Sequence, residues 1–461
     1  MSARLYRKAA AISLVAAVGL SLAACGSGKD SAKASGGKTT ITVDCPPLKT
    51  SNGGKDLQNW NNDIAKFQKL HPDIEIKTIS VGAQCDNPPD FTARLSGGTE
   101  ADVFYGYMTD LNQVLDSGQA MEITKYIDKN SVPNWDSLAD NIKKPFMDGD
   151  KVYGIGYAGY TMGLVINKNL FKQAGLDPAN PPTTWQDVAA DAKKIAALGN
   201  GVAGYREYSA GNTGGWHFTA ELYARGGADV SPDGKTATVN TPEAAAVLQN
   251  LHDMRWNDNS VGVKQLLTWP DLLTDAGAGK VGMYVGAPDT VTAIVGTFHG
   301  KYDDWAIGPM PGDNGPAKGT LGGGSGYFFK KGLSEAQVRA GLEWISFEDL
   351  TPGQGQFDYV YQKSVGVPVG LPEPLIWKTG SALEKQDSDL KKANSNLNLD
   401  DYAPYVNNPV PVVVEPPNAQ AIYAVLDAAM SGVLTTKDAD VNALLKTANG
   451  KIQTILSSQT S

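Results

Sequence analysis

Histidine is the first residue type to test for chemistry, because it is a common metal ligand and general base. The 461-residue chain holds four of them: His71, His217, His252 and His299. No two stand at the i, i+4 spacing of a metalloprotease helix, and none lies near a pair of cysteines. The sequence therefore predicts no metal site.

A glycine-rich run, Gly322–Gly326 (GGGSG), is the next candidate. It lacks the Lys-Ser/Thr of a P-loop and the spacing of a dinucleotide fingerprint. Ser325 does not fit a G-x-S-x-G nucleophile motif, because Tyr327 replaces the last glycine. Carboxylates are many and scattered, so an opposed pair for glycosidic cleavage stays open as an alternative. We expect no cofactor, no catalytic residues and no enzyme activity.

Aromatic residues give the positive signal. The chain has 9 Trp and 18 Tyr, and several stand beside glycine, as in Tyr105–Tyr107 (YGY), Tyr157–Tyr160 (YAGY) and Gly215–His217 (GWH). A flat ring covers the C–H face of a pyranose, while neighbouring amides and carboxylates bond its hydroxyl groups. These residue types therefore indicate carbohydrate binding. The alternative is packing alone, which we expect for three tryptophans on helical apolar stripes, Trp60, Trp185 and Trp344.

Two of the tryptophans are expected in contrasting environments. Thr184 and Asp187 stand at capping-box spacing, so Trp185 begins a helix and lies on its buried face. Trp216 stands between glycine and histidine, away from any apolar stripe. The sequence places it in a polar loop, where its ring could meet a ligand.

The spacing of apolar residues predicts the elements that position these side chains. Strands over 38–43, 74–81 and 101–105 alternate with helices, an order typical of a parallel sheet covered by helices. A second set of strands is expected over 162–167, 202–205 and 281–285, and further helices over 336–350, 419–430 and 441–456.

Cys45 and Cys85 each follow one of the first two strands. If those strands are parallel neighbours, both cysteines lie at one edge of the sheet and a disulfide between them is geometrically reasonable. Two free thiols are the alternative, because sequence does not fix the distance between the sulfur atoms.

The first 25 residues resemble a secretory signal that ends in a lipobox. Arg4, Arg7 and Lys8 precede an apolar run over 9–24, and Cys25 stands where cleavage would fall. The resemblance implies that Cys25 is acylated. A membrane-spanning helix is the weaker alternative, since the run is shorter than the roughly 20 residues that cross a bilayer.

Residues 26–38 are rich in Gly, Ser and Lys and are expected to form a flexible tether. We therefore expect an exported monomer, held by lipid on the outer face of the cytoplasmic membrane. The formal net charge of −9 and the lack of a long basic run argue against nucleic acid as a partner.

Several segments together resemble extracellular solute-binding proteins of the sugar ABC-transporter type, a maltose-binding-protein-like family. The segments are 98–126, 151–171, 182–187, 279–288, and 305–311 followed by 322–331. The resemblance implies two α/β lobes joined by crossing hinge strands, with the ligand between them and a membrane permease as partner. The expected limits are a signal peptide over 1–25, a tether over 26–38, lobe one over 39–155 with a return over 323–380, and lobe two over 156–322 and 381–461.

The resemblance also implies ligand contacts, carried over position by position. They are Tyr105, Tyr107, Thr109 and Asp110 after the third strand, Tyr160 on the crossing segment, Trp216, Asp289, the backbone of Gly324 and Ser325, and Tyr423. Tyr160 replaces an acidic contact, and Asp289 and Ile422 replace aromatic ones, so a long maltodextrin in the same pose is not expected. For the glycine-rich run, a hinge that needs unusual backbone angles is the alternative to ligand contact.

These observations predict the substrate-binding receptor of an ABC importer, which captures a mono- or oligosaccharide and delivers it to a permease. The alternatives are a receptor for a polyamine, an amino compound or an organic anion, and a surface-anchored glycoside hydrolase.

Overall fold

The structure is a computed structural model that describes residues 37–79 and 87–458. The chain divides into two units, Met1–Gly37 and Lys38–Ser461, and only the second is described below. The predicted signal peptide, Cys25 and the tether lie outside the described residues, apart from the tether's last two positions, and so does Cys85. No helix in the described ranges is both long and apolar enough to cross a bilayer.

The first lobe is built on a six-stranded sheet in the order β12-β11-β3-β1-β2, with β6 also paired to β11. Its strands are β1 (Thr39–Val43), β2 (Ile74–Thr78), β3 (Val103–Tyr107), β6 (Gly154–Thr161), β11 (Thr320–Phe329) and β12 (Val412–Val414). The first three strands are parallel, as the sequence predicts, with Ile41 opposite Ile76. Strand β11 runs antiparallel to β3 and β6.

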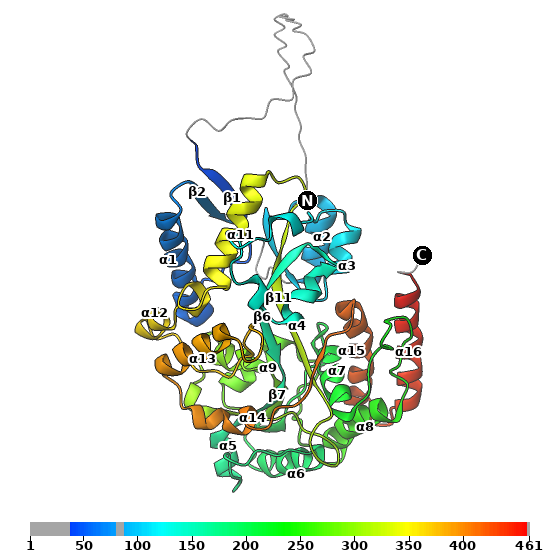
Figure 1. The fold of residues 1–461 in the computed structure, drawn as a ribbon. Helices are drawn as coiled ribbons and strands as arrows, with labels where there is room; N and C mark the ends of the chain where they lie inside the picture. The colour runs from blue at the N-terminus through cyan, green and yellow to red at the C-terminus, as the bar shows by residue number, and fades with distance from the viewer. Residues whose placement is uncertain (1–36, 80–86, 459–461) are drawn as a thin grey trace, which may run out of the picture. The chain divides into compact units, whose positions relative to one another are not determined.

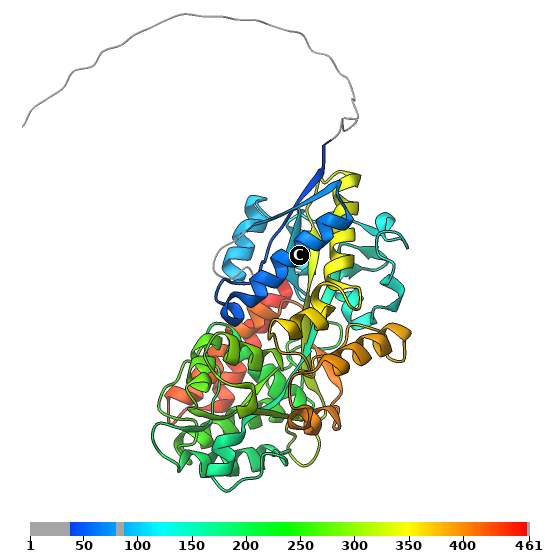
Figure 2. The same ribbon diagram turned by 90° about the vertical axis from the view of Figure 1, so that its left-hand side faces the viewer.

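Helices cover this sheet and share one apolar core with it. They are α1 (Lys55–Leu70), α2 (Pro88–Gly97), α3 (Leu111–Asp116), α4 (Asp140–Lys143), α11 (Glu335–Asp349), α12 (Tyr359–Ser364) and α13 (Ala382–Asn394). Helices α1 and α11 lie side by side (Figure 2), where the rings of Trp60 and Trp344 meet at 5.4 Å. Both tryptophans are buried, which confirms their predicted place in the core.

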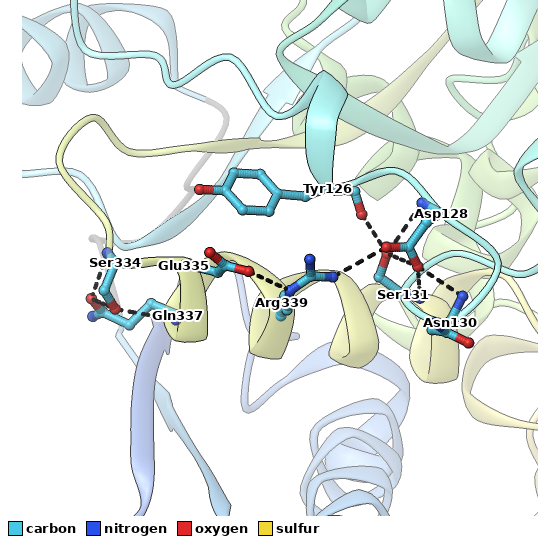
Figure 3. A network of polar contacts seen from close by, with 8 residues as sticks. All are labelled: Tyr126, Asp128, Asn130, Ser131, Ser334, Glu335, Gln337 and Arg339. Carbon is cyan, nitrogen blue, oxygen red and sulfur yellow. Dashed lines mark hydrogen bonds and ion pairs between the residues drawn. The ribbon is translucent and has the colours of Figure 1, made fainter. Parts of the chain in front are cut away.

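Polar contacts fix the start of α11 and tie it to a neighbouring loop (Figure 3). Ser334 and Gln337 form a capping box, in which each side chain accepts from the other residue's backbone N–H. One turn later, Arg339 donates to Glu335 at 3.1 Å and to Asp128 at 3.2 Å. The loop that carries Asp128 is thereby fastened to the helix.

The second lobe has a four-stranded mixed sheet, in the order β10-β7-β9-β8. Its strands are β7 (Gly163–Asn167), β8 (Ala203–Tyr205), β9 (Val281–Gly286) and β10 (Trp305–Gly308). Its helices are α5 (Lys168–Gln173), α6 (Trp185–Ala196), α7 (Thr213–Arg225), α8 (Pro242–Trp256), α9 (Trp269–Gly277), α10 (Asp289–Gly296), α14 (Ala403–Val406), α15 (Ala419–Thr435) and α16 (Val441–Ser458). Two apolar cores flank this sheet.

The chain crosses between the lobes along β6 and β7, returns along β11, and crosses again over the segment between α13 and β12. The crossing strands β6, β7 and β11 are labelled in Figure 1. Helix α13 packs through Leu383 and Leu390 against the first lobe's core, although it falls within the residues 381–461 that the sequence gives to lobe two. The residue limits of the lobes therefore stay a prediction, whereas the architecture of two α/β lobes is confirmed. A short hairpin, β4 (Met147–Asp148) and β5 (Lys151–Val152), completes the elements.

Candidate functional site

A cavity of about 520 Å³ lies between the two lobes. Its walls come from the start of α2, from the end of β3 and the start of α3, from Asn212 before α7, and from 418–421 at the start of α15. Three of the predicted ligand residues line it: Tyr105, Tyr107 and Asp110. Thr109, the fourth residue expected in this loop, also lines it.

The first wall follows the carboxyl end of β3, where ligands of α/β proteins commonly bind. Tyr105 and Tyr107 point to the same face because strand side chains alternate, and their rings meet edge to face at 5.7 Å. The Tyr105 hydroxyl lies 2.6 Å from the Ser325 hydroxyl of β11. The Asp110 carboxylate accepts from the Tyr107 N–H at 2.8 Å. Burial raises the pKa of this carboxyl to about 7.

A second group of side chains lies where the crossing strands meet lobe two. Trp216 Nε1 donates to the Tyr160 hydroxyl at 2.7 Å, and the two rings are edge to face at 5.7 Å. The Tyr423 hydroxyl donates to Glu415 at 3.0 Å, and Glu415 is also hydrogen bonded to Tyr160. Tyr160, Trp216 and Glu415 keep partial solvent access, whereas Tyr423 is buried behind Glu415.

Glu415 was not identified from the sequence. It follows the carboxyl end of β12, and its backbone N–H donates to Gly322 of β11 at 3.1 Å. Burial raises the pKa of its carboxyl to about 7, and the nearby charge of Asp110 adds to this rise. Ligands commonly bind after the carboxyl ends of strands, so a predicted strand here would have drawn attention to Glu415. The strand β12 has only three residues and lies in a proline-rich segment, so the sequence pattern does not reveal it.

Trp216 lies within α7, so its predicted loop environment is wrong. The two glycines before it suggest a loop, but they serve close packing inside the helix. A Cβ on Gly214 would lie 2.6 Å from the Ser209 Cα, and one on Gly215 would overlap the backbone of Tyr423. The Trp216 ring is half-buried and packs against both cores of lobe two.

Asp289 is the first residue of α10. The residue is solvent exposed, although neighbouring protein displaces part of the water around its carboxyl. Burial among these neighbours raises the pKa of the carboxyl to about 6, and the charge of Glu373 contributes. Asp289 does not line the 520 Å³ cavity, although its charge contributes, after burial, to the raised pKa of Tyr160.

Gly324 and Ser325 lie inside β11, paired with Gly159 and Ala158 of β6. The glycines of this run have no positive φ, so the alternative explanation by unusual backbone angles is wrong. They are required for close approach instead. A Cβ on Gly323 would lie 2.8 Å from the Tyr160 ring and would overlap the Glu415 carboxylate. Glycine here leaves space for the polar cluster of Tyr160 and Glu415.

Behind Trp216, buried ionisable groups form a network that sequence reasoning missed. Glu207 and Glu221 are hydrogen bonded to each other, so at least one carries a proton, and burial raises the pKa of both. The Tyr205 hydroxyl donates to Glu207 at 2.8 Å. His217 contacts Glu207 at 2.5 Å, and burial lowers its pKa to about 3, which keeps the ring neutral.

The remaining chemistry of the described residues is sparse. Within 37–79 and 87–458 no three His, Cys, Asp or Glu side chains are grouped to hold a metal ion. Cys45 is disulfide-bonded. Its pairing with Cys85 stays a prediction, because that residue lies outside the described ranges.

Residues 51–349 match the family model described as bacterial extracellular solute-binding protein. The chain belongs to this family. The family consists of solute-binding proteins. The sequence resemblance to this family implied two α/β lobes with the ligand between them, and the structure has two such lobes with a cavity between them.

Relatives and solved structures agree with this family. The chain is 27% identical over 224 residues to the sn-glycerol-3-phosphate-binding periplasmic protein UgpB of Agrobacterium fabrum. The aligned region covers 45% of this chain and 46% of the relative. The chain thus spans about half the length of the curated relatives it matches. Its fold resembles the cyclic alpha-maltosyl-1,6-maltose binding protein of Arthrobacter globiformis, with 21% identity, 92% and 100% coverage and a TM-score of 0.66. UgpB of Mycobacterium tuberculosis, solved with glycerophosphocholine, has 18% identity, 93% and 100% coverage and a TM-score of 0.69.

Proposed function

We propose that this solute-binding protein captures a carbohydrate between its lobes and delivers it to the membrane permease of an ABC importer. The observation that carries the proposal is the interlobe cavity, with aromatic rings and carboxylates on its walls. Closure of the lobes around the ligand is a hinge motion about the crossing strands. Such a motion would bring Tyr107 and Asp110, which line the cavity, toward Trp216 and Asp289 of lobe two.

Each proposed contact has a chemical role in sugar binding. The rings of Tyr105, Tyr107 and Trp216 offer apolar faces to pyranose C–H groups. Asp110 and Asp289 accept hydroxyl hydrogen bonds, which a buried sugar must make to avoid the cost of unpaired polar groups. Relatives of the same fold support this class, since one is named for a cyclic maltosyl saccharide and another was solved with acarbose.

Tyr160, Ser325, Gly324 and Tyr423 have a supporting role in this proposal. Tyr160 and Ser325 can each offer a hydroxyl to a ligand in the cleft, and they already hold the partners Trp216 and Tyr105 in place. Gly324 and Tyr423 are buried, so they support the cleft from behind.

A thermal-shift screen tests the proposal. The full chain is heated with a panel of mono- and oligosaccharides, with sn-glycerol 3-phosphate and glycerophosphocholine as non-sugar arms. A ligand at ~100 times its dissociation constant stabilises the folded state by about 2.7 kcal/mol. A saccharide is expected to raise the melting temperature. Stabilisation by the phosphates alone would contradict the carbohydrate class, and new sugar products on incubation would favour a hydrolase.

The lipid anchor is part of the same proposal, since a receptor must stay near its permease. Cys25→Ala should move the protein from the membrane fraction to the medium, or leave it unprocessed. The variant is compared with the wild-type chain by fractionation and by mass spectrometry of the N-terminus. An N-terminus at Met1 in the wild-type chain, with membrane association unchanged by the substitution, would contradict the anchor.

A further inference from the structure

The carboxylates around the cleft have no opposite charge to balance them. Within the described residues no ion pair joins Asp110, Asp289 or Glu415 to a lysine, arginine or histidine, and no cation lines the cavity. The charges that act on these groups are themselves negative: Asp110 acts on Glu415, and Glu373 acts on Asp289. Of these four acidic residues, only Glu373 forms an ion pair within the described ranges, in which Lys391 Nζ lies 3.7 Å from its carboxylate. The cleft is therefore electronegative.

Two of the helices that begin at the cavity, α7 and α2, do not offset this charge. Helix α15 also begins there, and in the described part of the chain its first turn has no side-chain cap. Helix α7 begins at the cavity, but Asp427 accepts from the Asn212 N–H at 2.7 Å and from the Gly215 N–H at 2.8 Å. Helix α2 is capped by the Asn87 side chain, which accepts from the Asp90 N–H at 3.2 Å. The chain's own oxygens thus already bond these amides, which an anionic ligand would otherwise use.

Tyrosine residues lie close to two of these carboxylates. Tyr107 adjoins Asp110, whose carboxylate accepts its N–H, and Tyr160 is bonded to Glu415. A cation within about 6 Å of a ring face is attracted to it, and more strongly where water is excluded. The same faces stack on pyranose C–H groups. One ligand that uses both features is a pyranose that carries a positive charge.

We propose that the ligand is an amino sugar, a saccharide with a protonated amine that lies between the Asp110 and Glu415 carboxylates, with Asp289 as a second anchor. This inference rests on the proposed function, because it names the class of carbohydrate that the interlobe cleft takes. A neutral sugar would leave these carboxyls to take up protons, since burial raises the pKa of Asp110 and of Glu415 to about 7, whereas a bound ammonium group favours their ionised form. A protonated amine supplies a positive charge and up to three N–H donors.

The test compares two ligands with the same sugar backbone, one with free amines and one with acetylated amines, and carboxylate variants separate the effect of charge from that of the added acetyl groups. Isothermal titration of the full chain uses the β-1,4-linked glucosamine trisaccharide and its fully N-acetylated counterpart, near pH 7 and at low salt. The proposal expects the amine to bind at least about tenfold more tightly, with affinity falling as salt is added. Glu415→Gln and Asp289→Asn should each weaken the amine about tenfold and the acetylated sugar little. Glu335→Gln, the same charge change at an exposed site on α11, is the control.

The outcomes separate this inference from the proposed function. Equal or tighter binding of the acetylated trisaccharide, or of another neutral saccharide of the panel, would overturn the amino-sugar class and leave carbohydrate capture intact. Spermidine bound as tightly as the amino sugar would overturn the need for a pyranose. If no saccharide binds, charged or neutral, both proposals fail. Melting curves of the Glu415 and Asp289 variants confirm that each has folded before its affinity is compared.

Discussion

Replacing Trp216 by alanine should weaken ligand binding and also lower stability. The ring is half-buried against both cores of lobe two, and Nε1 donates to Tyr160 at 2.7 Å. Truncating a fully buried tryptophan costs about 3–5 kcal/mol, so a half-buried ring should cost about 2 kcal/mol of unfolding free energy. Losing a stacking face should cost on the order of 2–4 kcal/mol of binding. That loss corresponds to a roughly 30-fold to 1000-fold weaker dissociation constant.

Two further variants separate these effects. Trp216→Phe keeps a ring but removes the donor to Tyr160, so it should cost only about 1 kcal/mol of stability and retain most binding. Trp185→Ala is the matched core control. Trp185 is 3% exposed at the start of α6, which Thr184 caps as the sequence predicts, and the Arg225 guanidinium lies 4.8 Å from its ring. Its truncation should cost about 3–5 kcal/mol of stability and leave affinity unchanged.

Guanidinium unfolding gives the stability of each variant, and titration calorimetry gives its affinity for the saccharide found in the screen. Normal affinity for Trp216→Ala would show that the ring does not contact ligand. Normal affinity together with a loss of stability as large as that of Trp185→Ala would show that Trp216 serves the core alone. Either result would refute the assignment of this face of lobe two to binding.

The free energy of unfolding should fall as pH rises from about 4.5 toward 8. Burial raises the pKa of Glu207 and that of Glu221 to about 8, so over this range the folded state holds protons that the unfolded chain releases. Glu207→Gln should flatten this fall in urea titrations across the same range; an unchanged slope would exclude the pair as its source. Gly323→Ala should cost about 1–3 kcal/mol, since its Cβ would meet Tyr160 at 2.8 Å; a variant as stable as wild type in urea unfolding would contradict this crowding. Non-reducing peptide mapping should recover Cys45 and Cys85 in one linked pair, and recovery of two free thiols would contradict the pairing.

The elements could be predicted from sequence where local pattern and tertiary packing agree. Strands β1, β2 and β3 alternate with helices whose apolar faces are clear, and their parallel order follows from that alternation. The cap at Thr184 is equally local, because its side chain accepts from the Asp187 N–H three residues on. Such features depend on neighbours in sequence and need no knowledge of the rest of the fold.

The environment of Trp216 could not be predicted in this way. Glycine weakens a helix by roughly 1 kcal/mol relative to alanine, so two glycines before an aromatic residue suggest a loop. In the structure, Gly214 and Gly215 let α7 approach α15 and the segment at Ser209 more closely than any side chain would permit. The packing partner is remote in sequence, and it reverses the local preference.

The candidate site also contains a feature that could not be predicted from the sequence, and here the deciding residue is one without a side chain. Sequence reasoning searches for side chains that could touch a ligand, and it found Tyr160 while it treated the run at Gly322–Gly326 as a possible hinge or a source of N–H groups. The structure shows that the Gly323 position leaves space which Tyr160 and Glu415 fill from two other crossing segments. A residue with no side chain thus determines where two polar ones meet, and Glu415 is recognised only once all three crossing segments are placed together.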